Sequence, residues 1–402
     1  MNVIFLSPSY PFEMQDYVRG LAEVGANVYA IGEGPLAPKL HPYVHDYLQV
    51  PKLFQEADLI ARVCTWAKNK NIHRVEALWE PLMMSAAHIR AKLGLPGMTP
   101  DTVLGFRDKS LMKQRVEAAG LRVPYAFRCT STKQITEAAE KIGYPLIIKP
   151  IAGAGSADTY RVDDKKQLER ICLLVRHVQE VSCEEFIDGR EFTYDTVCVG
   201  GMPRYENVAE YLPRPLIARS NEWISPIIIT VKDLHQPHIK QGIKLGRGVL
   251  KALKMGDGFT HMEWYLTPKG EVVFGEIGCR PGGAHLVDQM NFTSDIDLFR
   301  EWARAVCWND VRIEKPRKNN VAIVFKRAMG KGRIHRIAGL RAFLEQYGST
   351  VVVENLRKPG QMRRDWKQTL VSDGFVILRH PNWDITKYLA EKFAVHVQLY
   401  AR

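Results

Sequence analysis

The segment FTHMEWYLTPKGEVVFGEIGCR, residues 259–280, constrains the fold of this chain more than any other stretch. Apolar and polar residues alternate on both sides of Pro268–Glu271, which contains the Pro and Gly that are typical of a turn. We therefore predict a β-hairpin with a four-residue turn at these positions. In that register Tyr265 lies opposite Phe274.

The same register places Glu263 directly opposite Glu276. Opposed side chains lie about 5 Å apart, where like charges repel each other by about 3 kcal/mol at an effective dielectric constant of 20. A cation between the two would relieve this repulsion, and carboxylate and phosphate oxygens are ligands that Mg²⁺ prefers. Strand alternation also puts Arg280 on the face of Glu276. Alternatively, both glutamates lie at an exposed sheet edge, and a three- or five-residue turn would separate them.

A basic motif and an acidic motif come earlier in the chain. The apolar strand PLIIK ends at Lys149, and the glycine-rich sequence AGAGSA follows at residues 152–157. Such a loop can direct backbone N–H groups at phosphates, with the lysine as a neighbouring charge, although small-residue turns after strands are common. The sequence EEFIDGRE, Glu184–Glu191, ends a strand in two carboxylates. It is either part of the same site or a solvated connector.

Residues 1–100 alternate short apolar runs with helical patterns, which indicates a parallel sheet covered by helices. The expected strands and helices are Val3–Leu6, Glu13–Val24, Asn27–Ile31, Leu53–Lys68 and Pro81–Leu93. The GxGxxG fingerprint of dinucleotide-binding folds does not follow the first strand. A loop rich in Gly and Pro, residues 94–100, precedes the first expected domain boundary.

The remaining chain predicts two further units, which gives domains at 1–105, 106–310 and 311–402. The middle unit mixes helices with antiparallel hairpins, including a hairpin at Glu184–Val199 and a long helix at His235–Leu253. The last unit is a small α+β module whose final strand is expected at Val395–Leu399. The fold class is thus a multidomain combination of α/β and α+β units.

The net charge of +12 resides in the last unit, because residues 311–402 contain 19 basic and 7 acidic side chains. The basic residues concentrate in Lys326–Arg341 and Arg357–Lys367. We hypothesise that this module faces the active-site cleft and attracts anionic substrates or an acidic partner, and that Arg363 and Arg364 contribute. A solvated basic surface without a partner is the alternative.

The sequence predicts a cytoplasmic protein without membrane contact. Its first residues carry no basic region of the kind that begins a signal peptide, and no apolar run approaches the ~18 residues of a membrane span. The seven cysteines are scattered and never spaced as CxxC, which favours buried free thiols in a reducing compartment over a zinc site.

Four motifs in this order resemble the ATP-grasp superfamily: FRDK at 106–109, PLIIKPIAGAGSAD at 145–158, EEFIDGREFTYD at 184–195 and HMEWYLTPKGEVVFGEIGCRPGG at 261–283. The resemblance covers roughly residues 1–310. The module with GRIHRIAG, VVVENLRKPGQ and DGFVILRHP is similar to the closing domain of the biotin-carboxylase-like branch. The resemblance implies an N-terminal parallel α/β domain, an ATP-grasp fold of two α+β subdomains and a small C-terminal α+β module.

The resemblance also implies which residues contact ATP, namely Lys109, Lys149, Gly155, Ser156, Glu184, Glu185, Ile187 and Glu191. The two lysines would bind the phosphates, and residues 153–157 would form a lid over them. Glu184 and the backbone of Glu185 and Ile187 would hold adenine. Glu191 would bind the ribose hydroxyls.

Glu263 and Glu276 would bind Mg²⁺, with Mn²⁺ as a second candidate, and Arg280 would be the catalytic residue that stabilises the transferred phosphoryl group. Many members carry Asn two positions after the second glutamate, where this chain has Gly278, so one metal ligand is missing.

The implied activity is that of an ATP-dependent ligase that activates a carboxylate as an acyl phosphate and couples it to an amine such as an amino acid. The alternatives are a carboxylase-type enzyme that uses bicarbonate, and a nucleotide-binding or RNA-binding regulator without turnover. Candidate substrate walls are Pro213–Ser220, with Arg214 and Arg219, and Pro281–His285. Expected partners are small acids and amines, with an acidic carrier protein or nucleic acid at the basic module and a homodimer as further candidates.

Overall fold

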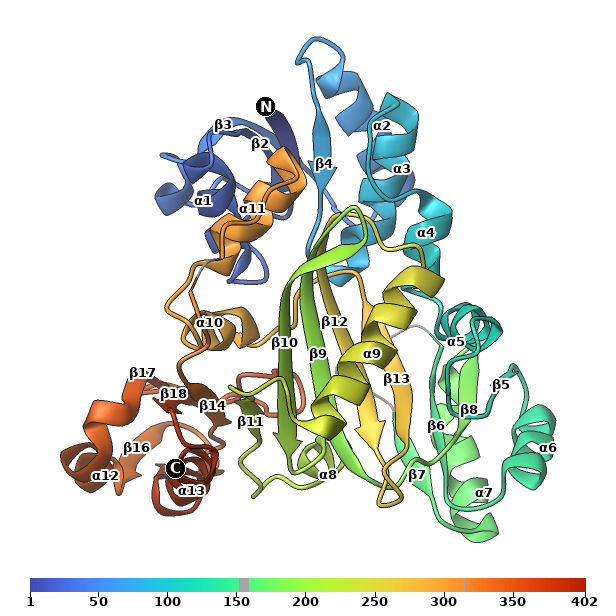
Figure 1. Ribbon diagram of the computed structural model, residues 1–402, viewed down its shortest axis with the longest axis vertical. Helices are drawn as coiled ribbons and strands as arrows, with labels where there is room; N and C mark the ends of the chain where they lie inside the picture. The colour runs from blue at the N-terminus through green and yellow to red at the C-terminus, as the bar shows by residue number, and fades with distance from the viewer. Residues whose placement is uncertain (152–158, 314) are drawn as a thin grey trace.

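The computed structural model describes residues 1–151, 159–313 and 315–402. The chain forms a three-cornered molecule around a long antiparallel sheet (Figure 1). The N-terminal α/β unit lies at the top of that view, a small subdomain at the lower right, and the C-terminal module at the lower left.

The N-terminal unit is built on a parallel sheet with strand order β3-β2-β1-β4, as the alternation of strands and helices predicts. Its elements are β1 (Asn2–Leu6), α1 (Met14–Glu23), β2 (Asn27–Glu33), β3 (Val44–Val50), α2 (Glu56–Ala67), β4 (Arg74–Glu76), α3 (Met83–Leu93) and α4 (Pro100–Gly105). Strands β3 and β4 were not predicted from the sequence. The first lacks strict alternation and the second is very short.

The small subdomain has an antiparallel sheet of order β5-β8-β6-β7, packed against α6 and α7. Its elements are α5 (Lys109–Ala118), β5 (Ala126–Cys129), α6 (Thr132–Ile142), β6 (Leu146–Pro150), β7 (Tyr160–Val162), α7 (Lys165–Leu174) and β8 (Val181–Glu185). The predicted hairpin at Glu184–Val199 is wrong. β8 pairs with β5 and β6, whereas β9 joins the long sheet, so residues 186–189 carry the chain from one sheet to the other.

The long sheet has strand order β13-β12-β9-β10-β11-β14-β18-β17. The middle of the chain supplies β9 (Arg190–Val199), β10 (Met202–Leu212), α8 (Pro215–Ser220), β11 (Ile227–Thr230), α9 (Pro237–Ala252), β12 (Gly258–Leu266), β13 (Val272–Gly278), α10 (Leu286–Asn291) and α11 (Leu298–Trp308). Helix α9 lies directly on the sheet because Gly242 and Gly246 face the rings of Trp264 and Tyr194. A Cβ at either glycine would come within 2.2 Å of those rings.

The β12–β13 hairpin confirms the pairing of Glu263 with Glu276. The predicted pairing of Tyr265 with Phe274 is wrong, because the register near the turn is shifted by one position: Leu266 pairs with Val272, and Tyr265 pairs with Val273. A β-bulge at Gly275 then restores the pairing of the glutamates. Only glycine fits there, because a Cβ would lie 2.8 Å from the carbonyl oxygen of Glu263.

The C-terminal part adds β14 (Asn320–Phe325), β18 (Gly374–His380) and β17 (Val351–Leu356) to the long sheet, and forms a second sheet from β15 (Met329–Gly330), β19 (Gln398–Ala401) and β16 (Ile334–Ala338). Helices α12 (Leu340–Tyr347) and α13 (Trp383–His396) complete it. Because α13 extends through His396, the predicted last strand begins at Gln398 instead of Val395. The division at 105 and 310 stays a prediction, since α11 packs on α1 and the long sheet crosses residue 310.

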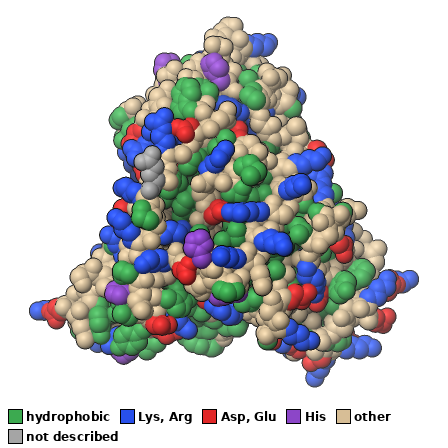
Figure 2. Space-filling view, in the orientation of Figure 1, with side chains coloured by type: hydrophobic (Ala, Val, Ile, Leu, Met, Phe, Trp, Pro, Cys, Tyr) green, Lys and Arg blue, Asp and Glu red, His purple; other side chains and the backbone are tan. Residues whose placement is uncertain are grey.

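The basic residues of the C-terminal module do not form a single exposed patch. Lys326 is fully buried and donates to Ser225 Oγ and the Ala394 carbonyl, and Arg327 is buried against the ring of Trp366. On the face drawn in Figure 2, basic side chains (blue) are spread over the whole molecule rather than gathered at the lower left. Part of the positive charge of this module is therefore buried inside it and does not contribute to an exposed basic surface.

Six of the seven cysteines are buried, Cys64 is half-buried, and all are free thiols. Among the described residues, no helix combines the length and the apolarity that crossing a bilayer requires.

Candidate active site

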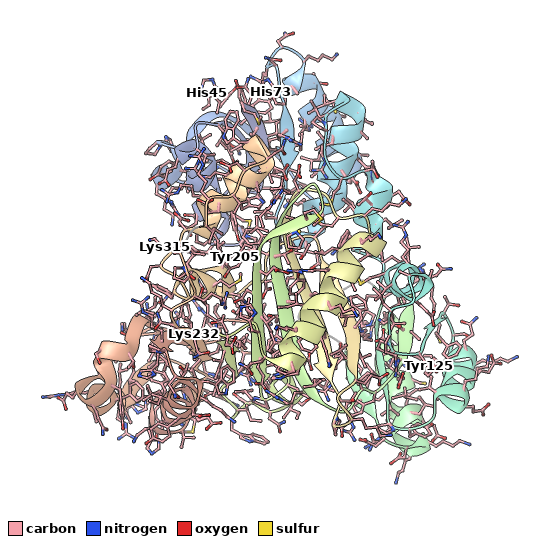
Figure 3. The ribbon with its side chains drawn as sticks, in the orientation of Figure 1. His45, His73, Tyr125, Tyr205, Lys232 and Lys315 are labelled. Atoms are coloured by element: carbon pink, nitrogen blue, oxygen red, sulfur yellow. The ribbon has the colours of Figure 1, made fainter. Side chains whose placement is uncertain are left out.

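A pocket, termed the nucleotide-type pocket, opens between the small subdomain and the long sheet, where β6 and β8 face β12 and β13. Its apolar lining residues include Pro124, Ile147, Phe186, Ile187, Leu216 and Tyr265. Its charged lining residues are Lys109, Lys149, Glu184, Glu185, Glu191, Arg214, Glu263 and Glu276. Such a mixed lining suits a ligand that has both an apolar and an anionic part. Tyr125, labelled in Figure 3, belongs to the small subdomain that forms one wall.

The two predicted phosphate-binding lysines converge although forty residues separate them in the sequence. The ammonium of Lys109 lies 3.3 Å from Glu276 Oε2, and that of Lys149 lies 3.8 Å from the same oxygen. Lys149 also lies 3.0 Å from Glu184 Oε2. Burial favours the neutral carboxyl of Glu276, but Lys109 and Lys149 outweigh it and lower its pKa to about 2.

A third lysine, Lys113, was not predicted. It is buried, and its ammonium lies 2.7 Å from Glu184 Oε1, which also accepts from Ser182 Oγ. Burial lowers the pKa of Lys113 to about 8 in spite of Glu184, whereas Lys149, which lies between two carboxylates, has a raised pKa. Lys113 follows Lys109 by four residues on α5, so the spacing that puts both on one helix face was the available signal.

Glu184 pairs with Lys113 and Lys149 through its two oxygens, and its contact with adenine stays a prediction. The pocket still includes Glu185 and Ile187. However, the Glu185 carboxylate pairs with Arg122, and its N–H donates to the Tyr125 carbonyl. Gly155 and Ser156, predicted as part of the lid, lie outside the described residues.

The other carboxylates in the pocket are less well neutralised. Burial, together with the charge of Glu276, raises the pKa of Glu263, whose oxygen accepts from Tyr211 Oη at 3.2 Å. Burial and the charge of Glu263 raise the pKa of Glu191 to about 8, even though Arg214 Nε lies 3.1 Å from it. Crowded, desolvated carboxylates of this kind are stabilised by an added cation.

The donor set fits a magnesium ion that takes the rest of its ligands from phosphate and water. Glu263 and Glu276 supply hard oxygens from facing strand positions. Among the described residues, no group of three or more His, Cys, Asp or Glu side chains could hold a metal. Gly278 supplies no ligand, and the side chain of Arg280 packs over it, so that a Cβ there would lie 3.3 Å from Arg280 Cγ.

Arg280 lines a larger cleft as well as a small hollow beside the two glutamates. Its guanidinium lies 2.7 Å from Glu80 Oε2, and Glu80 also pairs with Arg107. A small hollow is lined by Glu263, Glu276 and Arg280 together. Glu80 was not predicted, because nothing in the sequence relates it to a motif 200 residues away.

The larger cleft has a volume of about 880 Å³ and lies between the N-terminal unit, the loop after β13 and the C-terminal module. The predicted wall Pro281–His285 lines it, whereas Arg214 lines the nucleotide-type pocket instead. Arg219 lines neither cavity and donates to the Lys367 carbonyl.

Residues 106–205 match a family model described as an ATP-grasp domain. Among curated proteins, an L-arginine-specific L-amino acid ligase from Bacillus subtilis is 25% identical over 227 residues, which are 55% of this chain and 54% of that protein. The chain thus spans little more than half the length of that relative. The prediction of an ATP-grasp domain is confirmed for residues 106–205.

Solved structures show the same fold over the whole chain. An L-amino acid ligase from Bacillus licheniformis superposes with a TM-score of 0.79 at 20% identity and covers 100% of this chain and 98% of its own. An N5-carboxyaminoimidazole ribonucleotide synthetase from Thermotoga maritima has a TM-score of 0.72 at 15% identity, with coverage of 100% and 99%. The predicted fold class is therefore confirmed.

Proposed function

We propose that this ATP-grasp chain is an ATP-dependent ligase that activates a carboxylate as an acyl phosphate and couples it to an amine, with release of ADP and phosphate. The observation that supports it best is that three cavities share lining residues. Glu263 and Glu276 line both the nucleotide-type pocket and the small hollow, and Arg280 lines both the small hollow and the large cleft. A phosphoryl group could therefore meet a second substrate beside Arg280.

The residues suit a reaction in which charges of the same sign must approach each other. A substrate carboxylate oxygen attacks the γ-phosphorus while the bond to ADP breaks, and an amine nitrogen then attacks the acyl carbon while phosphate leaves. Lys109 and Lys149 neutralise the phosphates, and Arg280 stabilises the acyl phosphate. A magnesium ion held by Glu263 and Glu276 would supply further neutralisation of phosphate charge. Mn²⁺ has the same ligand preference for oxygen and is a second candidate.

Amino acids are the proposed substrates, because two of the similar proteins are L-amino acid ligases and the large cleft has room for more than bicarbonate. A carboxylase-type reaction is the second candidate, since a synthetase that makes a carboxyamino product shares the fold. A regulator that binds ATP without turnover is a third possibility of a different class. A cytoplasmic homodimer remains our expectation for the assembled protein.

The test is phosphate release from Mg-ATP with amino acids, other carboxylic acids and bicarbonate, singly and in pairs, followed by mass spectrometry. We expect release with amino acids and a product whose mass equals the two substrates minus one water. Release with bicarbonate alone would favour the carboxylating reaction. Nucleotide binding without release under every condition would favour the regulator.

A further inference from the structure

The large cleft carries an excess of positive charge. Its lining contains five basic side chains, Arg107, Arg280, Arg357, Lys358 and Arg364, and two acidic ones, Glu13 and Glu80. Glu80 is shared by two of the arginines, and Lys358 pairs with Glu354 at 2.7 Å. The remaining cations are Arg357 and Arg364, both from the loop that joins β17 to β18.

Neither of these two arginines has an ion pair with a carboxylate among the described residues. Arg357 is half-buried, and its buried Nε has no hydrogen-bond partner in the described structure. Arg364 donates through Nη1 to the Ser372 carbonyl at 3.1 Å. Arg364 is exposed, and burial of its guanidinium together with the positive charge of Arg357 lowers its pKa, while Asp373 acts in the opposite direction. Two arginines that line the same cleft without a carboxylate partner favour the binding of an anion there.

The loop that carries them, residues 357–373, is held at both ends and in its middle. The buried Asp373 carboxylate accepts from the N–H groups of Arg364 and Ala328. In the middle, Gly360 donates its N–H to the Ile334 carbonyl. A long connection without regular structure that is nevertheless tied down in this way is typical of a binding loop.

We propose that Arg357 and Arg364 bind a second anionic group on the acid substrate, a carboxylate or phosphate distinct from the carboxylate that is activated beside Arg280. This inference rests on the proposed ligase function and goes beyond it, because it assigns a substrate class. Arg280 belongs to the loop after β13 and the two arginines to the loop after β17, so the cleft provides two separate positions for negative charge. The substrate would be an acidic amino acid or a phosphorylated acid.

The experiment compares substrates that differ only in the second anion: aspartate with asparagine, glutamate with glutamine, and O-phosphoserine with serine. Phosphate release from Mg-ATP gives kcat and KM for each member. We expect the anionic member of at least one pair to be preferred in kcat/KM by about ten- to a hundredfold, which corresponds to one or two charge-assisted contacts. Carboxylate and phosphate pairs distinguish the two sources of the charge.

The variants Arg357→Gln and Arg364→Gln should reduce that preference towards one, mainly by raising KM of the anionic member. Arg341→Gln is the matched control, because Arg341 is an exposed arginine of the same module that pairs with Glu345 on its own helix. Thermal melting shows whether each variant is folded. Equal use of both members of every pair, or a preference that both variants retain, would overturn the proposal.

If no acid supports phosphate release, the ligase function fails, and the anion site is tested separately by calorimetry with inorganic phosphate and succinate. Binding to the wild-type chain that both variants lose would support the site. Absence of binding, or binding that the variants retain, would contradict it.

Discussion

Glu276→Gln is expected to abolish turnover while the chain stays folded. The change is nearly isosteric, but it removes the negative charge that lies 3.3 Å from Lys109 and faces Glu263 across the hairpin. The glutamine can no longer neutralise the lysines or supply an anionic metal ligand. Loss of such an electrostatic contact typically lowers kcat by about a hundredfold or more. The effect is measured as phosphate release from Mg-ATP with the substrates that support release by the wild-type chain.

Glu271→Gln is the control for this prediction. It makes the same chemical change on the same hairpin, at a half-exposed position in the turn that pairs with Arg122 outside the pocket. We expect activity near that of the wild-type chain. A Glu276→Gln variant that releases phosphate at the wild-type rate would show that this carboxylate takes no part in the reaction.

Lys149→Ala is expected to weaken ATP binding by about ten- to a hundredfold. The lysine would contribute a charge-assisted contact to the phosphates, worth about 1.5–3 kcal/mol, or about one decade of affinity per 1.4 kcal/mol. The fold should survive, because Glu184 keeps its contacts with Lys113 and Ser182 after the lysine is removed. Calorimetric titration with ATP measures the dissociation constant.

Lys133→Ala provides the comparison, because Lys133 lies on α6 of the same subdomain with its side chain 87% exposed. Its removal should leave ATP affinity unchanged. If Lys149→Ala binds ATP as tightly as this control, Lys149 does not contact the phosphates.

The hairpin shows that the pairing of two residues can be predicted correctly even when the predicted turn is wrong. Strand alternation places Glu263 and Glu276 on one face only if the turn length is right, and the actual turn shifts the nearby pairs by one residue. The bulge at Gly275 compensates for this shift. A glycine inside a strand is the signal for such a bulge, but its position relative to the turn depends on contacts that the sequence does not display.

Local motifs were predictable, whereas partners from distant segments were not. Lys109, Lys149 and Glu276 each lie in a motif, and the structure brings them together. Glu80 and the pairing of the Glu184 carboxylate depend on how the N-terminal unit and α5 pack against the pocket, which no local pattern records. The roles of these residues in binding ATP and metal stay predictions.

The basic C-terminal charge was predictable as a total but not in its placement. Lys326 is buried in the module, and Arg363 pairs with Glu222 away from the cleft, whereas Arg364 lines the cleft as expected. Arg357 also lines it and is the better choice for a charge-removal test. The sequence does not show which arginines line the cleft, because the course of the loop between β17 and β18 decides where each arginine lies.

Transfer of oxygen from the acid to phosphate tests the central claim most directly. An amino acid substrate labelled with ¹⁸O in its carboxylate is incubated with Mg-ATP, an amine substrate and the chain, and the released phosphate is analysed by mass spectrometry. An acyl phosphate intermediate predicts one ¹⁸O atom in each phosphate, because the carboxylate oxygen that attacked phosphorus leaves with it. Unlabelled phosphate, with both labelled oxygens retained by the acid, would contradict the account.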